Sequence, residues 1–248
     1  MKHNILELYT AIQSEGSRAG FPTIVVRTTG CTHRCFFGEG GWCDSWYTSI
    51  HPEKSKYTIS DVIDMYNKHP YIKEMMITGG SPTMWPELLE ELTQFAKERN
   101  IITTIETEGS HFIKTKHPID LISLSPKFSN SIPKLGATTP LGKEVNEAMI
   151  KQHNKFRMNY EVMEQMIKYH KDFHYKPVWD GKDETLKEIE EFRVKMNIPK
   201  NKTWMMPAGD TRDTLIQMYP IVINKCIEIG YNFTGREHII AYDTKREV

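Results

Sequence analysis

The sequence lacks any apolar run long enough to cross a bilayer, and its first residues, MKHNILELYTAIQSEG, lack the apolar core of a signal peptide. Its charge has no excess of either sign, because Lys and Arg together number 32 and so do Asp and Glu. A balanced charge gives no electrostatic reason to expect a membrane or a nucleic acid as partner. We therefore expect a cytoplasmic protein that binds neither directly.

Cysteine is scarce as well, with 4 in 248 residues, yet three of them fall between positions 31 and 43. Thiols stay reduced in the cytoplasm, so this group is expected to bind a metal rather than form disulfides. The paired CxxC half-sites typical of zinc are absent from the sequence. Cys226, within IVINKCIEIG, is expected to be a small buried side chain in the middle of a helix.

Apolar strand-like runs alternate with amphipathic helical segments along the chain, without an internal repeat. Strands are predicted at 23–27, 74–78, 101–107, 120–125, 173–179 and 203–206. Helices are predicted from near Ser60, and at 86–99, 159–173, 183–196 and 211–229. A long loop is expected at 128–142 and a short edge strand within 235–248. This order predicts an α/β fold with a parallel sheet, either open or curled into a partial barrel.

Polar and glycine-rich motifs come directly after several of these predicted strands. They are the cysteine loop, Gly79-Gly80, Glu106 and Ser125-Pro126-Lys127. The carboxyl ends of parallel strands meet at one edge of a sheet, which is where active sites form in such folds. We therefore expect these motifs to share one site.

The cysteine loop contains Cys31, Cys35 and Cys43. Three thiolates can bind three irons of a cubane and leave the fourth iron open to the amino and carboxylate groups of S-adenosylmethionine. Soft thiolates favour iron–sulfur clusters or zinc over hard cations. The alternative is therefore a zinc site completed by His33 or His51.

The loop resembles the signature of the radical S-adenosylmethionine superfamily, CxxxCxxC after the first strand. Here seven residues separate Cys35 from Cys43, and they include Gly38, Gly40 and Gly41, which would let a longer loop fold out and return. The resemblance implies a [4Fe–4S] cluster, S-adenosylmethionine as cofactor, and a single domain over 1–248. It also implies a partial (βα)6 TIM-like barrel of parallel strands.

Six further segments resemble, in order, those of the 7-carboxy-7-deazaguanine synthase family: IQSEG, GFPTIVVRTTGC, CDS, ITGGSP, IETEGS and LSPK. The resemblance implies a lyase that converts 6-carboxy-5,6,7,8-tetrahydropterin to 7-carboxy-7-deazaguanine with loss of ammonia, in queuosine and 7-deazapurine biosynthesis. It implies an electron donor such as flavodoxin or ferredoxin, and a homodimer. The radical chemistry belongs to the cluster and S-adenosylmethionine, so no side chain is expected to be catalytic.

The same resemblance implies roles for individual residues. Arg27 would clamp the substrate carboxylate with its planar fork, while Gln13 and Glu15 would bond the pterin edge. The full set for the substrate is Ile12, Gln13, Glu15, Gly16, Arg27, Arg236 and His238. The set for S-adenosylmethionine is Trp42, Thr78, Gly79, Gly80, Glu106, Ser125 and Lys127.

This chain departs from the family pattern at three positions. Ser45 stands where the family has a Thr that helps to hold Mg²⁺, and a Ser hydroxyl can also be a ligand. Ser81 replaces a Glu after the glycine pair, and Met206 replaces a Gln near the ribose. Two other functions remain open at this point, an activase that installs a glycyl radical on a partner protein and a zinc-stabilised binding module.

Overall fold

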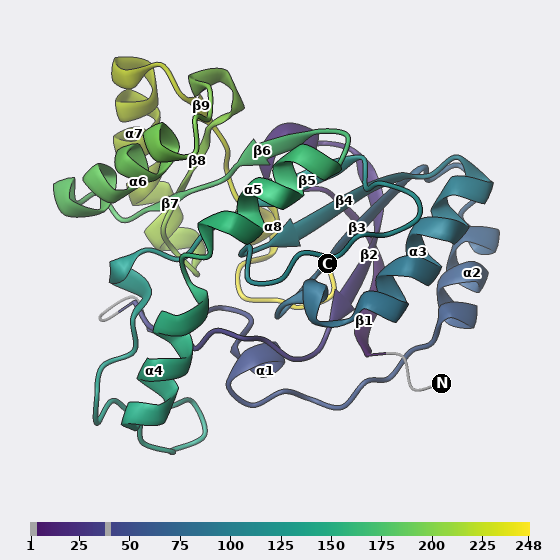
Figure 1. Ribbon diagram of the computed structural model, residues 1–248, viewed down its shortest axis with the longest axis horizontal. Coiled ribbons are helices and arrows are strands. Elements are labelled where there is room, and N and C mark those ends of the chain that lie inside the picture. Colours follow the sequence, from purple (N-terminus) through teal and green to yellow (C-terminus); the bar gives the residue numbers. More distant parts are fainter. Residues whose placement is uncertain (1–3, 38–40) are drawn as a thin grey trace.

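The computed structural model describes residues 4–37 and 41–248, and its main sheet has six strands in the order β1-β2-β3-β4-β5-β6 (Figure 1). β1 pairs with β2 in antiparallel fashion, and every later neighbour is parallel. The strands are Ile5–Ile12, Pro22–Thr28, Glu74–Gly79, Ile102–Thr107, Leu121–Leu124 and Phe173–Tyr175. The parallel part therefore places the ends of β2 to β6 at one edge.

A row of β-branched side chains crosses the middle of this sheet. In the register, Val26 pairs with Ile77, Ile77 with Ile105, and Ile105 with Ile122. All four are at most 1% exposed. Because branched side chains pack well on a pleated surface, this row explains why these segments form strands and fixes their register.

Helices cover the sheet from its sides. α2 (Ile59–Lys68) contacts β2, α3 (Pro86–Arg99) contacts β4, and α5 (Tyr160–Tyr169) contacts β5. Figure 1 shows α2 and α3 side by side to the right of the strands. Two further helices, α1 (Trp46–Ser49) and α4 (Glu147–Phe156), lie below the sheet in that view.

A second set of parallel strands extends the architecture beyond β6. β7 (Val178–Trp179), β8 (Trp204–Pro207) and β9 (Asn232–Phe233) form it, with α6 (Asp183–Lys195) and α7 (Arg212–Ile229) beside them at the upper left of Figure 1. A parallel bridge between Tyr175 and Thr203 joins the two sheets. The continuing parallel order confirms the predicted partial TIM-like barrel.

All six predicted strands are confirmed, with one division. The predicted strand at 173–179 is two strands, because Lys176 and Pro177 lie between them and Pro has no N–H for a ladder. The helix predicted from near Ser60 is α2, which begins at Ile59 and has Thr58 as its cap. The predictions did not include β1, β9, α1 or α4.

The predicted edge strand in 235–248 is wrong. Residues Glu237–Tyr242 form α8, and its Ile239 is buried while Tyr242 is exposed. A helix of this length can bury one apolar face, and β9 already occupies the neighbouring position on β8. The short apolar run alone did not distinguish these outcomes.

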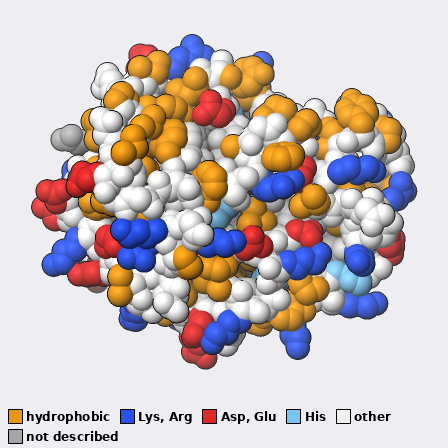
Figure 2. Space-filling view, turned by 90° about the horizontal axis from the view of Figure 1, so that it is seen from above, with side chains coloured by type: hydrophobic (Ala, Val, Ile, Leu, Met, Phe, Trp, Pro, Cys, Tyr) orange, Lys and Arg blue, Asp and Glu red, His pale blue; other side chains and the backbone are white. Residues whose placement is uncertain are grey.

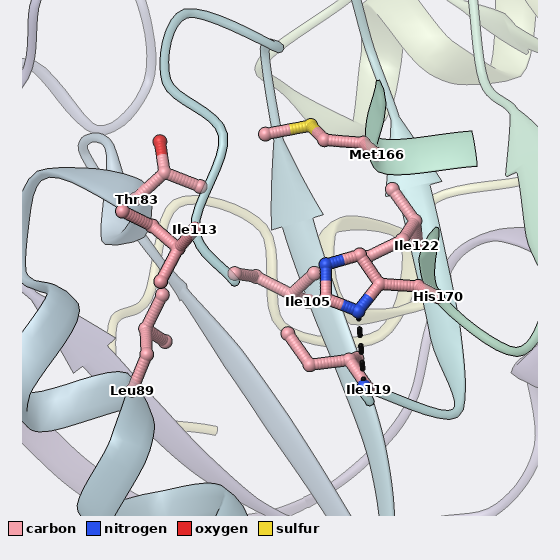
Figure 3. Close-up of a pocket in the computed structure, with 8 residues that line it drawn as sticks. All are labelled: Thr83, Leu89, Ile105, Ile113, Ile119, Ile122, Met166 and His170. Atoms are coloured by element: carbon pink, nitrogen blue, oxygen red, sulfur yellow. Dashed lines mark hydrogen bonds between the residues drawn. The ribbon is translucent and has the colours of Figure 1, made fainter. Parts of the chain in front are cut away.

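A small cavity lies within the apolar core (Figure 3). His170 accepts a hydrogen bond from the Ile119 N–H at 3.1 Å, and burial lowers the pKa of its ring to about 4. The lining residues are Thr83, Leu89, Ile105, Ile113, Ile119, Ile122, Met166 and His170. Since most of these side chains are apolar, we assign the cavity to core packing.

The described residues form no helix with both the length and the hydropathy that a bilayer span requires. Acidic and basic side chains are intermingled on the face seen in Figure 2, in keeping with the zero net charge.

Replacing a core side chain on α3 should lower the stability of the fold. Leu92 is 0% exposed, so Leu92→Ala should reduce the free energy of unfolding by about 2–5 kcal/mol in urea denaturation. Ile221→Ala is a matched control because Ile221 is 49% exposed, and its effect should stay within about 0.5 kcal/mol. Equal effects of the two substitutions would contradict this placement of the core.

Candidate cluster and substrate site

The cysteine loop follows β2 at the carboxyl edge of the sheet. The Phe37 N–H bonds the Gly41 oxygen at 2.7 Å, Phe36 pairs with Trp42, and the Cys43 N–H bonds the Cys35 oxygen at 3.2 Å. Phe36 and Phe37 thus pair with Trp42 and Gly41, which brings Cys43 back to Cys35. Gly41 has a φ of 75°, whereas Gly38 and Gly40 lie outside the described residues.

The three thiols form a suitable donor set for an iron–sulfur cluster. Cys35 is buried and Cys31 and Cys43 are half-buried. Burial raises the pKa of all three thiols, that of Cys35 to about 11, and the neighbouring cysteines raise those of Cys31 and Cys43 further. Deprotonation at neutral pH therefore requires a metal to replace the protons.

Nothing in the described ranges, 4–37 and 41–248, gathers three His, Cys, Asp or Glu side chains closely enough to hold one metal ion. A cubane makes a different demand, because each thiolate binds a separate iron and the sulfurs need not converge on one point. His51, one of the two candidates for a zinc ligand, bonds the Thr139 hydroxyl at 3.0 Å instead. The loop therefore fits a cluster better than a mononuclear centre.

Gly80 brings the end of β3 against the cysteine loop. A Cβ at Gly80 would lie 2.2 Å from the Gly30 oxygen and 2.9 Å from the Cys31 Cβ. The next residue, Ser81, donates its N–H to the same Gly30 oxygen at 2.8 Å. The sequence predicted a close approach of Gly79-Gly80 to S-adenosylmethionine, and the structure shows that the absence of a side chain is needed by the cysteine loop itself.

Arg27 lies on β2 directly opposite Glu7 of β1. Its Nε is 2.7 Å from Glu7 Oε2, although the N–H does not point at the oxygen in hydrogen-bond geometry. The two terminal nitrogens make long bonds to hydroxyls, 3.4 Å to Ser45 and 3.3 Å to Tyr9. Glu7 thus holds the guanidinium in place, and the outer edge of the guanidinium makes no strong bond to the residues that the structure describes.

Arg236, the residue that precedes α8, connects two carboxylates. Its Nε donates to Glu15 at 3.0 Å, another nitrogen donates to Asp44, and a third donates to the Gly209 oxygen at 2.6 Å. Asp44 follows Cys43 directly and accepts the Ser45 hydroxyl at 3.2 Å. The C-terminal segment is therefore bound to both the cysteine loop and the segment after β1.

Lys176, at the break between β6 and β7, continues these contacts. It is 3% exposed, and its ammonium bonds both Glu15 and Glu106. Glu106 in turn accepts the Thr78 hydroxyl at 2.9 Å. We call the connected set the charged bridge; it consists of Ser45, Asp44, Arg236, Glu15, Lys176, Glu106 and Thr78.

The charges of the bridge stabilise one another against the cost of burial. Burial alone would raise the pKa of the Glu15 carboxyl, but Lys176 and Arg236 outweigh it and hold that pKa well below its usual range. Burial opposes the charge of Lys176 as well, yet Glu106 and Glu15 raise its pKa above the ordinary value. Arg236 likewise lowers the pKa of Asp44 against burial. Glu15, Lys176 and Asp44 are therefore charged at neutral pH.

The other residues predicted for the substrate lie near this bridge or beside β1. Gln13 is 2% exposed, and its side-chain nitrogen has no hydrogen-bond partner among the described residues. A Cβ on Gly16 would lie 2.3 Å from the His174 ring, so no larger residue fits there. Burial lowers the pKa of His238, which lies within the electrostatic influence of Glu15 and Arg236. Ile12 ends β1 and is half exposed.

Of the residues predicted for S-adenosylmethionine, Ser125 and Lys127 follow β5. A third, Trp42, makes its contacts elsewhere. The Lys127 ammonium bonds the Ser125 hydroxyl at 3.1 Å, and its charge lowers the pKa of the Cys35 and Cys43 thiols, against burial. The Trp42 indole instead packs on Phe36 and donates to the Thr138 oxygen at 2.9 Å. Trp42 therefore joins the cysteine loop to the long loop at 128–142.

Comparison with known proteins is informative over nearly the whole chain. A model of the radical SAM superfamily matches residues 25–193. A 7-carboxy-7-deazaguanine synthase of Rhodopirellula baltica is 31% identical over 242 residues, which cover 98% of this chain and 87% of the relative. The chain belongs to the 7-carboxy-7-deazaguanine synthase family of the radical SAM superfamily.

Two further matches agree with this family. An enzyme of the same name from Halobacterium salinarum is 29% identical over 249 residues, covering 98% of this chain and 91% of the relative. The crystal structure of QueE from Escherichia coli superimposes with a TM-score of 0.59 at 19% identity, covering 95% of this chain and 94% of that one. At that identity the crystal structure supports the fold alone.

Membership of the radical SAM superfamily implies a [4Fe–4S] cluster and S-adenosylmethionine, and the three thiols fit the cluster. This membership does not favour the alternative of a zinc-stabilised binding module. The names of the relatives do not favour the glycyl-radical activase either.

The sequence analysis missed Lys176, Asp44 and Glu7 as parts of this radical SAM site. Lys176 and Glu7 each interrupt an apolar strand segment, FHYKPVW and ILELYT. A charged side chain inside such a segment must find a partner when buried, so this signal was available in the sequence. Glu15, one partner of Lys176, lies 161 positions away in the sequence, and no local pattern names it.

Removing any loop thiol should prevent stable cluster binding. Wild-type protein purified without oxygen should contain about four irons and four sulfides per chain. Cys31→Ala, Cys35→Ala and Cys43→Ala should each lose most of this content in iron and sulfide assays. Cys226→Ala should keep it, because Cys226 is buried in α7 beside the Asn232 oxygen. Full iron content in all three loop variants would contradict the assignment.

Proposed function

We propose that this chain converts 6-carboxy-5,6,7,8-tetrahydropterin to 7-carboxy-7-deazaguanine with loss of ammonia. The observation that carries the proposal is the charged bridge, which joins residues predicted for the substrate to residues predicted for S-adenosylmethionine in one connected, mostly half-buried set beside the cysteine loop. The names of two relatives that cover most of this chain support the same reaction.

Arg27 is the proposed partner of the substrate carboxylate. Its terminal nitrogens make bonds of 3.3 Å and 3.4 Å to hydroxyls, which a carboxylate can replace with shorter, charge-assisted bonds. Glu7 supports the guanidinium from behind and fixes its plane. A planar, held guanidinium selects a carboxylate by shape as well as by charge.

Gln13 and Glu15 are the proposed partners of the pterin edge. The buried Gln13 side-chain nitrogen has no partner among the described residues, and such a group costs about 1–3 kcal/mol unless a ligand supplies an acceptor. The ionised Glu15 can accept hydrogen bonds from the amino and ring N–H groups of a pterin. Ile12, Gly16, Arg236 and His238 complete the proposed substrate set.

Glu106 connects the proposed S-adenosylmethionine set to Lys176. When bound, the reduced cluster and S-adenosylmethionine supply a radical that removes hydrogen from the substrate. Glu106 can accept ribose hydroxyls, because each of its oxygens has one bond in the chain and room for another. Ser125 and Lys127 would bind the methionine carboxylate, with Thr78, Gly79 and Gly80 as further contacts.

Mg²⁺ is part of the proposal at Ser45. The Ser45 hydroxyl lies 3.2 Å from an Asp44 carboxylate oxygen and 3.4 Å from Arg27, so oxygen donors lie beside the expected substrate carboxylate. Mg²⁺ prefers such oxygens and would neutralise and orient that carboxylate. We also include a reductant such as flavodoxin or ferredoxin, a homodimer and a cytoplasmic location in the proposal.

The reaction can be tested directly. Anaerobically reconstituted protein, supplied with dithionite, S-adenosylmethionine and 6-carboxy-5,6,7,8-tetrahydropterin, should form 7-carboxy-7-deazaguanine in an assay by mass spectrometry. A tetrahydropterin without the carboxylate is the matched control and should give no deazaguanine. Absence of product from protein with a full cluster would overturn the substrate assignment while leaving the cluster assignment intact.

Shortening the clamp should weaken substrate binding without removing the cluster. Arg27→Lys keeps the charge but loses the fork, so KM for the carboxypterin should rise about 10- to 100-fold, as expected for the loss of 1.5–3 kcal/mol of charged hydrogen bonding. Iron content should equal that of the wild type. Arg99→Gln is the control, since Arg99 lies at the far end of α3. An unchanged KM in Arg27→Lys would argue against the clamp.

A further inference from the structure

A second buried polar cluster lies beneath the cysteine loop, apart from the charged bridge. Its centre is Glu108, 4% exposed, which follows β4. One oxygen, Oε1, accepts the hydroxyls of Thr32 at 3.0 Å, of Ser81 and of Ser110. His33 Nδ1 lies 3.6 Å from the same oxygen. We call these five residues the Glu108 cluster.

The Glu108 cluster connects the cysteine loop to the ends of two strands. Thr32 and His33 lie between Cys31 and Cys35, Ser81 follows β3, and Ser110 follows β4. Every member is at most 5% exposed. The backbone N–H of His33 also lies 3.4 Å from the Cys31 sulfur. Movement of Glu108 would therefore move the segment that carries two of the three thiols.

Glu108 also carries a buried negative charge. Burial opposes its ionisation, but His33 and the hydroxyls of Ser110 and Ser81 outweigh burial and keep the pKa of this carboxyl well below its usual range. The charge of Glu108 in turn raises the pKa of the Cys31 and Cys35 thiols. The charge is thus close enough to act on the group that these thiols hold, where the low dielectric weakens screening.

We propose that Glu108 is a positioning residue that fixes the cysteine loop on the ends of β3 and β4, and that its charge lowers the reduction potential of the cluster. A neighbouring negative charge disfavours the addition of an electron, and charge and hydrogen bonding are main determinants of cluster potentials. The identity of Ser81 agrees with this role, because a carboxylate at position 81 would face Glu108. The inference rests on the proposed cluster but needs no pterin substrate.

Glu108→Gln separates the charge from the shape, since the amide oxygen can still accept the three hydroxyls. Redox titration of the reconstituted protein, followed by electron paramagnetic resonance of the reduced cluster, is the measurement. We expect the ratio of reduced to oxidised cluster at a fixed potential to rise about tenfold, the order of one unit charge in a partly screened site. For a one-electron couple this is a positive shift of about 59 mV.

Glu74→Gln is the matched control. Glu74 is a buried carboxylate that pairs with Arg18 at the opposite end of β3, so its removal should leave the potential unchanged. A Glu108→Gln protein with full iron content and the wild-type potential would overturn the proposal, because a purely structural role predicts that result.

Ser110→Ala provides an independent test if Glu108→Gln fails to hold the cluster. This change removes one hydroxyl that donates to the carboxylate and leaves the negative charge less compensated, so the potential should shift in the negative direction. No shift, or a positive one, would contradict the proposed effect of the charge. Both titrations omit the pterin, so failure of the substrate assay and failure of this proposal give different results.

Discussion

Parallel pairing of β2 to β5 is the constraint on which the site depends. It brings four strand ends to one edge, and each end carries a segment of the proposed site: the cysteine loop, Gly79-Gly80, Glu106 with Glu108, and Ser125 with Lys127. The contact between Gly80 and Gly30 leaves no space for a side chain at position 80. A slip of one residue in β3 would turn its side chains to the other face and place a side chain where Gly80 admits none.

The same edge of the sheet also holds charged side chains that are removed from solvent. The charged bridge and the Glu108 cluster both hold carboxylates that are ionised despite burial, because cations or hydroxyls from other segments compensate them. Such groups cost desolvation energy, and an apolar core of the same volume would often be as stable. Their presence at the strand ends therefore points to ligand binding rather than to stability. The bridge fixes the directions of Glu15 and Glu106 before any ligand arrives.

Local patterns predicted the parallel core and most helices, because branched apolar runs and amphipathic repeats report on one face of one element. They failed where a segment was short or its partner distant. The short tail became α8 rather than a strand. β1 was missed for a different reason, because the charged Glu7 interrupts its apolar run. The three cysteines were predicted from their spacing and Arg27 from the family resemblance. Lys176 was not predicted, because its role depends on its contacts with Glu15 and Glu106.

The amino-acid sequence by itself determined the donor chemistry of the cysteine loop, the alternation of strands and helices, and the family. The tertiary structure alone decided that Cys43 returns to Cys35, that Lys176 joins two carboxylates, and that Glu108 lies under the thiols. The reason is physical. Residue type and spacing fix what a side chain can bind, but the burial and the partners that set its charge come from segments that meet only when the chain folds.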